Sequence, residues 1–155
     1  ALGLTTSVGD LAGACLFATT MGISRMLYGK FGEKIDLIKF MLISGVICVV
    51  SYLLAGLSAM PIWGLVGCVM CGFSVGIMWP GSISITVPRI PKGGTALFAL
   101  LAMAGDMGGA FGPSVVGYFS QHAGDNLQAG LLTGCIFPLI MLATLIAMKK
   151  MTPEG

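Results

Sequence analysis

Long apolar runs separated by short polar connections dominate the chain. The longest covers residues 40–88 and contains no charged residue over its 49 positions. As an α-helix it would be about 74 Å long, whereas the hydrocarbon core of a bilayer is about 30 Å thick. The run therefore predicts two membrane-spanning helices, joined by a turn at residues 58–61, where small residues and a proline interrupt it.

The remaining apolar runs predict three further spanning helices. Each is bounded by glycine, proline or charged positions, and each exceeds the roughly 20 residues that a helix needs to cross a bilayer. The five predicted spans cover residues 8–29, 37–57, 62–87, 95–120 and 127–148. We expect an all-α fold, a polytopic transmembrane helix bundle.

The basic residues give the expected orientation. With five spans the connections alternate between the two sides of the membrane, and all eight lysines and arginines lie in or beside the connections of one side. Basic residues favour the cytoplasmic side. We therefore expect a multi-pass protein of the cell membrane, with the N-terminus of this chain outside and its C-terminus in the cytoplasm. Because the chain begins at Ala1 without a signal peptide, we also expect further sequence before it.

Composition excludes several other classes of protein. Hydrophobic residues make up 56% of the chain and charged residues 9%, with a mean hydropathy of +0.98, which excludes a soluble or a disordered chain. The net charge of +2 is too small to suggest a nucleic-acid partner. The chain has one histidine, no catalytic triad, and a lone Cys-x-x-Cys pair at residues 68–71 without a second pair. We expect neither an enzyme nor a metal or cofactor site.

Small residues and prolines indicate how the helices pack. Helices in lipid associate through small residues that let their backbones approach. Two predicted spans carry such residues at helical spacing: Gly64, Cys68, Gly72 and Gly76 in the third, and Gly105, Gly108, Gly109 and Gly112 in the fourth. Pro80 and Pro113 each remove a helix hydrogen bond and predict kinks, which mark a packed interior or an aqueous cavity.

Asp106 is the most informative ionisable residue. It lies 11 residues after Thr95 and 14 before Ser120, near the middle of its span. A carboxylate at mid-bilayer costs at least ~2.5 kcal/mol, so such residues face a cavity or a partner and often bind a proton. Asp106 either takes part in proton coupling or substrate binding, or forms a structural hydrogen bond to a neighbouring helix.

Other polar side chains near the predicted cytoplasmic end of the spans each have two possible roles. Ser82, Ser84 and Thr86 alternate along the third span and either line a cavity or bond back to helix carbonyls. Arg25 lies about 6 Å inside the predicted edge of the first span and either reaches the headgroups or forms part of a cytoplasmic gate.

Three segments carry a family pattern. Residues 27–34 form a glycine turn in which Lys30, Gly32 and Lys34 follow a helix, although the acidic position of that motif falls at Gly29. Residues 76–80 read as a bend before Pro80, and residues 105–113 as a glycine-rich helix. In this order and sidedness, the chain resembles helices eight to twelve of a twelve-helix transporter of the major facilitator superfamily, most like fucose-permease-type sugar symporters. Helices two to six of the other half are the competing placement.

The resemblance implies a secondary transporter of a small solute, working by alternating access together with a missing N-terminal half in the lipid bilayer. It implies that Trp79 stacks on the substrate, Ser82 and Ser84 offer hydrogen bonds, and Asp106 carries a coupling proton. Gating is implied for Arg25, Lys30, Gly32 and Lys34; helix kinks and packing are implied for Pro80, Gly105, Gly109, Gly112 and Pro113. The alternative is a membrane scaffold or assembly subunit that transports nothing.

Overall fold

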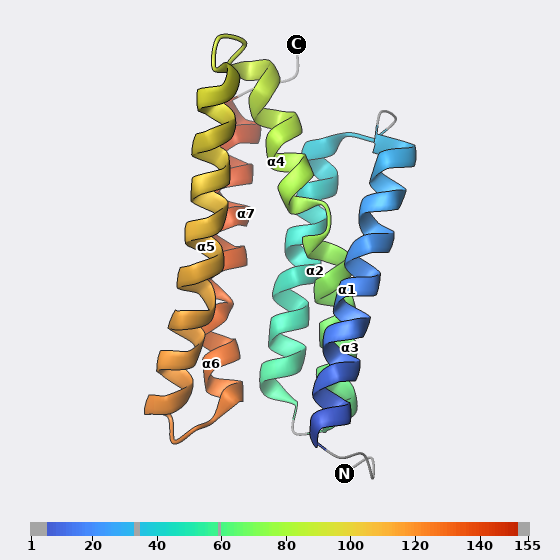
Figure 1. Cartoon of the computed structure of the whole chain (residues 1–155), viewed down its shortest axis with the longest axis vertical. Helices are drawn as coiled ribbons and strands as arrows, with labels where there is room; N and C mark the ends of the chain where they lie inside the picture. The colour runs from blue at the N-terminus through green and yellow to red at the C-terminus, as the bar shows by residue number, and fades with distance from the viewer. Residues whose placement is uncertain (1–5, 33–34, 59, 152–155) are drawn as a thin grey trace.

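The computed structural model describes residues 6–32, 35–58 and 60–151, and it forms an upright bundle of long helices (Figure 1). No β-strand occurs within those ranges, and five helical segments are long and apolar enough to cross a membrane. The prediction of an all-α bundle with five spans is confirmed. The elements are α1 (Thr6–Phe31), α2 (Leu37–Leu57), α3 (Pro61–Val75), α4 (Met78–Thr86), the 3-10 turn η2 (Val87–Arg89), α5 (Gly94–His122), α6 (Leu127–Gly134) and α7 (Ile136–Met151).

Two of the five spans are interrupted helices. The sequence predicted one kinked helix over residues 62–87, but the span Ile62–Arg89 is divided into α3, α4 and η2, with its break at residues 76–77. The last span, Leu127–Lys150, is divided into α6 and α7 at Cys135. In each case a proline, Pro80 or Pro138, lies three to four residues beyond the break, because its missing N–H leaves the carbonyl four residues earlier without its helix partner.

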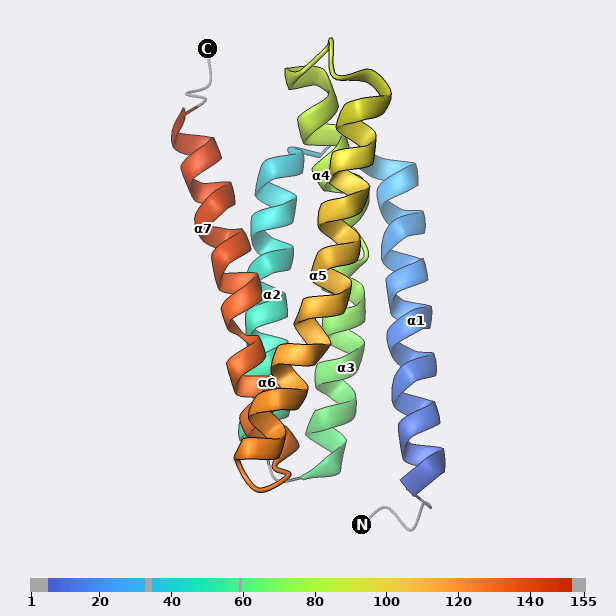
Figure 2. The same cartoon turned by 60° about the vertical axis from the view of Figure 1, so that its left-hand side comes forward.

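Helix α2 lies at the centre of the contacts. It packs against α3 on one side and against α6 and α7 on the other, while α1 packs against α3 and α5 packs against α6 (Figure 2). A small buried cluster of Met41, Ile85 and Leu145 joins α2, α4 and α7. Most other large apolar side chains are exposed, as expected where lipid replaces water around the bundle.

Glycines of the third span allow it to approach α1 closely. A Cβ atom placed on Gly72 would collide with the Phe17 carbonyl of α1, and one on Gly76 would lie 2.7 Å from the Met21 carbonyl. These two members of the predicted glycine stripe therefore lie in the α1–α3 interface. A Cβ on Gly64 would meet nothing within 4 Å in the described part of the chain, so that member lies outside the contact.

Helix α5 is the least covered element. None of its residues is buried, although it runs the full length of the bundle (Figure 1). A Cβ on Gly108, Gly109 or Gly112 would meet no atom within 4 Å among residues 6–32, 35–58 and 60–151. Pro113 lies inside α5 without dividing it. The predicted packing role of Gly109 and Gly112 thus has no partner helix within the described residues.

The connections that carry basic residues share one end of the bundle. The end of α1, the start of α2, the segment between α4 and α5, and the end of α7 lie at one end of the bundle, and the start of α1 lies at the other (Figures 1 and 2). Basic residues of these segments include Lys30, Lys39, Arg89, Lys92 and Lys149. We refer to this end as the basic end. All five cysteines are free thiols.

Candidate functional site

The break between α3 and α4 forms the centre of the candidate site. Pro80 has no N–H to donate to Gly76, so the Gly76 carbonyl lacks its helix partner. Arg25 of α1 supplies one: its Nε atom donates to the Gly76 oxygen over 3.3 Å. In a bilayer such a carbonyl must be satisfied by protein or water. Arg25 was predicted either to reach the headgroups or to form part of a gate. In the structure it donates a hydrogen bond to the backbone carbonyl left free at the helix break.

A second bond joins α1 to the segment beyond the break. The Tyr28 hydroxyl donates to Oγ of Ser84 in α4 over 3.2 Å. Arg25 and Tyr28 are three residues apart, so they lie on one face of α1. One face of α1 thus holds the interrupted span on both sides of its break, at Gly76 and at Ser84.

Trp79 connects the break to α5. A Cβ atom placed on Gly105 would lie 2.8 Å from Cζ3 of Trp79, so the indole packs directly on the backbone at Gly105. Trp79 remains 39% exposed, which leaves part of its ring surface available. The residue after Gly105 is Asp106, which is exposed and has no hydrogen-bond or ion-pair partner among the residues that the structure describes.

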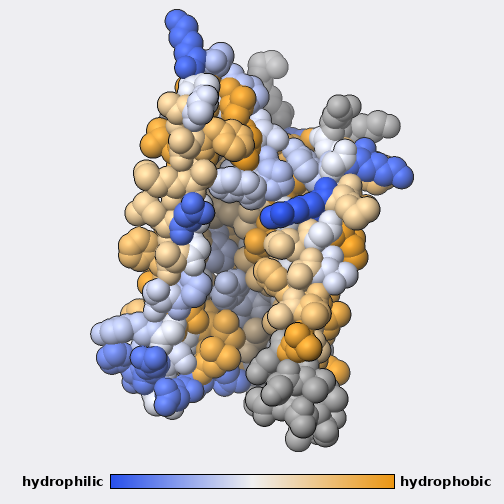
Figure 3. All heavy atoms as spheres, viewed as in Figure 1, coloured by the Kyte–Doolittle hydropathy of each residue, from blue (hydrophilic) through white to orange (hydrophobic). Residues whose placement is uncertain are grey.

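These contacts place Arg25 and Asp106 at similar depths in the bundle. Arg25 bonds to Gly76, and Trp79, three residues further along the chain, touches the residue before Asp106. The space-filling view shows a hollow between the α5 side of the molecule and the α1–α4 side, with hydrophilic surface on its walls within a largely apolar exterior (Figure 3). This hollow is where a polar solute could meet the chain.

The remaining polar residues of α4 are mostly engaged within the helix. The Ser82 hydroxyl donates to the Met78 carbonyl over 2.7 Å, and Thr86 donates to the Ser82 carbonyl over 2.7 Å. Such bonds are the common way to satisfy hydroxyls in membrane helices. Ser84 differs, because its hydroxyl accepts from Tyr28 instead.

The loop-motif residues occupy the basic end of α1. Lys30 lies in the last helical turn, with its ammonium 5.5 Å from the Phe31 ring centroid, and Gly32 sits against the Tyr28 ring. Lys34 lies outside the described residues. No carboxylate in the described ranges lies within ion-pair distance of Arg25 or Lys30, so a gating salt bridge is not formed inside this part of the chain.

Two participants were not identified from the sequence: Tyr28 and the Gly76 carbonyl. The carbonyl could have been found by counting four residues back from Pro80. The nearest arginine at that depth, Arg25, had already been singled out. Tyr28 carried no signal of its own, because its bond to Ser84 depends on the rotation of α1 against α4.

The chain is similar to known proteins over nearly its whole length. The family model for the Major Facilitator Superfamily matches residues 1–154. The chain is 27% identical over 159 aligned residues to a protein named multi-drug resistance efflux pump PmrA in two strains of Streptococcus pneumoniae, TIGR4 and R6. Those alignments cover 96% of this chain but 39% of each relative, so the chain spans about two fifths of their length. No solved structure gives a match.

Proposed function

Because the chain belongs to the Major Facilitator Superfamily, a family of membrane transporters, we propose that it is part of a secondary transporter for a small organic solute. In this proposal the solute binds near mid-membrane, beside the break in the third span, and the protein moves it by alternating access. The chain corresponds to helices eight to twelve, and an N-terminal half of the same protein completes the binding cavity. The basic end faces the cytoplasm, since basic residues favour that side.

Asp106 carries the proposal. It is a carboxylate in the middle of an apolar span, exposed, and without a partner in the described part of the chain. A charge in that position is costly unless it meets a proton, a cation or an aqueous cavity. We assign it the coupling proton, which it binds when the site faces the compartment of lower pH and releases when the site faces the other.

Trp79 is the proposed contact for an apolar part of the solute. Its ring is held on one side by Gly105 and is otherwise partly exposed beside Asp106. An aromatic face next to a carboxylate suits an amphipathic or aromatic cation. The printed name of the two streptococcal relatives, a multi-drug efflux pump, supports this class of solute.

Sugar symport, which the likeness to fucose permeases implies, is the second candidate. The same Trp79 surface favours it, because sugar rings also stack on aromatic faces. The hydroxyls assigned to sugar binding weigh against it, since Ser82 donates to Met78 and Ser84 accepts from Tyr28. A sugar would have to replace these bonds with its own hydroxyls.

The test uses the full-length protein reconstituted in liposomes with an imposed pH gradient. Ethidium, an aromatic cation, and radiolabelled fucose serve as the two probes. We expect gradient-driven movement of ethidium, loss of that movement in Asp106→Asn, and retention of ethidium exchange without a gradient. Asp36→Asn, which removes a carboxylate outside the spans, is the matched control, and its gradient-driven movement of ethidium should equal that of the wild type.

Each result separates the alternatives. Movement of fucose instead of ethidium would show that the solute is a sugar rather than an organic cation, and it would still support a transporter. Normal gradient-driven movement by Asp106→Asn would contradict the role of Asp106 in proton coupling. A well-folded full-length protein that moves neither probe, nor a wider panel of sugars and organic cations, would favour the scaffold alternative.

A further inference from the structure

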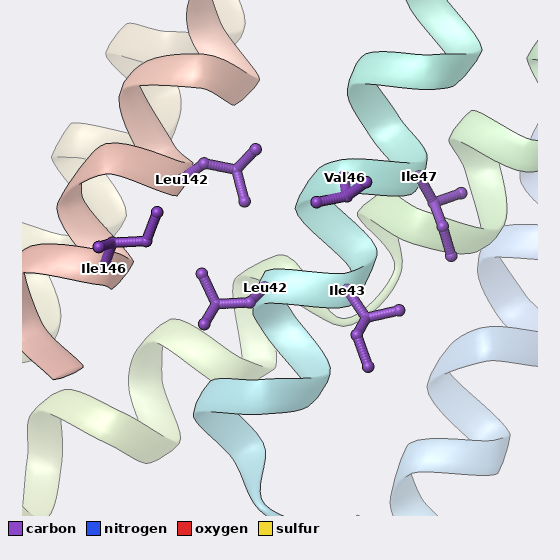
Figure 4. A pocket seen from close by; sticks show the side chains of 6 residues that line it. All are labelled: Leu42, Ile43, Val46, Ile47, Leu142 and Ile146. Carbon is purple, nitrogen blue, oxygen red and sulfur yellow. The ribbon is translucent and has the colours of Figure 1, made fainter.

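An apolar groove lies on the outer surface of the bundle, away from the α4–α5 contact. It is formed between α2 and α7, where Leu42 and Val46 point toward Leu142 and Ile146 (Figure 4). Its volume is about 410 Å³. The groove is lined entirely by branched aliphatic side chains: Leu42, Ile43, Val46, Ile47, Leu142 and Ile146.

The described chain leaves this groove open. Ile43, Val46 and Ile146 are each about half exposed, at 58%, 53% and 47%. An open aliphatic groove on a membrane helix bundle offers no hydrogen-bond partner to a polar solute. It does offer continuous contact to a hydrocarbon chain that lies along it.

At the basic end of the bundle, lysines lie beside the groove. Lys149 and Lys150 follow Ile146 by three and four residues, which puts them on the groove face of α7. Both are exposed, and no carboxylate of the described residues lies within ion-pair distance of either. On the opposite wall, Lys39 precedes Leu42 by three residues and is already paired with Asp36 over 2.9 Å.

We propose that this groove binds an anionic phospholipid. One acyl chain lies between α2 and α7, and the phosphodiester headgroup is held by the ammonium groups of Lys149 and Lys150. The apolar walls match the acyl chain, and the exposed lysines at the bilayer surface match the charge of the headgroup. The role is independent of the solute site, which lies on the α1, α4 and α5 side of the bundle.

A second copy of the chain fits the groove less well. A two-fold axis along the membrane normal through this groove would bring Lys149 and Lys150 of one copy toward the same lysines of the other. Among the described residues, no carboxylate lies within ion-pair distance of Lys149 or Lys150 to offset this repulsion between like charges, and Asp36 already pairs with Lys39. A lipid phosphate satisfies the same lysines without this repulsion.

The test is native mass spectrometry of the full-length protein, titrated with phosphatidylglycerol or with phosphatidylcholine carrying the same acyl chains. We expect preferential retention of phosphatidylglycerol. Replacing both lysines, Lys149→Gln with Lys150→Gln, should weaken that retention by about fivefold per lysine and leave phosphatidylcholine unchanged. Val46→Trp fills the groove and should weaken retention of both lipids.

Matched controls keep the result specific. Leu53→Trp lies seven residues after Val46 on the same face of α2, outside the groove, and should bind lipid as wild type. Phosphatidylglycerol with a photoreactive group in its acyl chain should label α2 and α7. This experiment uses the wild-type protein, so its result does not depend on whether a variant folds.

Three outcomes would overturn the proposal. The first is equal retention of the two lipids. The second is photolabelling confined to other helices. The third is a Val46→Cys thiol that a membrane-permeant maleimide cannot reach in lipid-free detergent, which would show that a second copy or the rest of the polypeptide covers the groove.

Discussion

The guanidinium of Arg25 donates a hydrogen bond to the carbonyl of Gly76, the group that Pro80 leaves without its helix partner. The bond fixes α1 to the break between α3 and α4. It also explains structurally why the apolar helix α1 contains the basic residue Arg25. Because the acceptor is free only as long as residue 80 is a proline, the interaction can be tested by changing either end.

Replacing Arg25 should be costly only while Pro80 is present. Arg25→Met keeps the length of the side chain but removes the donor, and it should lower the free energy of unfolding by about 1 kcal/mol. In a Pro80→Ala background the restored N–H can donate to the Gly76 carbonyl, so the same change should cost much less. Unfolding of the four full-length variants by sodium dodecyl sulfate in mixed micelles measures the coupling. Equal costs in both backgrounds would contradict it.

The five spans could be predicted from sequence because lipid allows few solutions. A charge-free run of 49 residues must form helices, and the basic residues then fix how these alternate. The breaks were harder to locate. The bend predicted at residues 76–80 contains the break, because the carbonyl that Pro80 frees lies one turn earlier, but the sequence did not predict that the helix would end there, at Val75. The break before Pro138 was not anticipated at all.

The candidate site could be predicted only in part. Asp106 and Trp79 stood out because a carboxylate at mid-span and an aromatic residue beside a proline are both unusual in a helix core. Their neighbourhood did not follow from spacing, since the Trp79–Gly105 contact depends on how α4 and α5 meet. Likewise, the sequence could not show that Gly72 packs against α1 and that Gly64 does not. Only one face of α3 lies against α1, and the sequence does not say which face that is.

That difference between two glycines of α3 gives a second prediction. Gly72→Ala places a methyl group against the Phe17 carbonyl and the Thr20 hydroxyl of α1. The backbone of α1 at Phe17 cannot move away from the added methyl group as a flexible side chain could. We therefore expect a loss of about 1–3 kcal/mol in the free energy of unfolding. Gly64→Ala meets no described atom within 4 Å and should be neutral, or stabilising by up to about 1 kcal/mol through helix propensity. Thermal unfolding of the two full-length variants should show a loss of stability for Gly72→Ala and none for Gly64→Ala. A similar loss in both would argue against the α1–α3 interface as the cause.

The start of α2 gives a prediction on pH. The Lys39 side chain and backbone N–H both donate to Asp36, and these bonds lower the pKa of that carboxyl below its ordinary 3.8. A lowered pKa stabilises the folded state above pH 3.8, and this contribution is lost as the pH falls through the folded-state pKa. Asp36→Asn should therefore melt below wild type near neutral pH, and the gap should close in acid. Asp125→Asn, an exposed carboxylate without an ion pair in the described ranges, should show no such closing gap.

The contact between Trp79 and Gly105 gives the last prediction. A methyl group on Gly105 would come within 2.8 Å of the indole, closer than carbon atoms pack, so the ring must swing away from α5. Because Trp79 is partly exposed, the ring has room to move, and we expect Gly105→Ala to cost only about 1 kcal/mol of stability. The larger effect should be on solute binding, seen as a raised KM for ethidium with little change in kcat. Trp79→Phe leaves space beside Gly105, so adding Gly105→Ala to it should raise KM no further. If the methyl group raised KM by the same factor with phenylalanine at position 79, its effect would not pass through the indole.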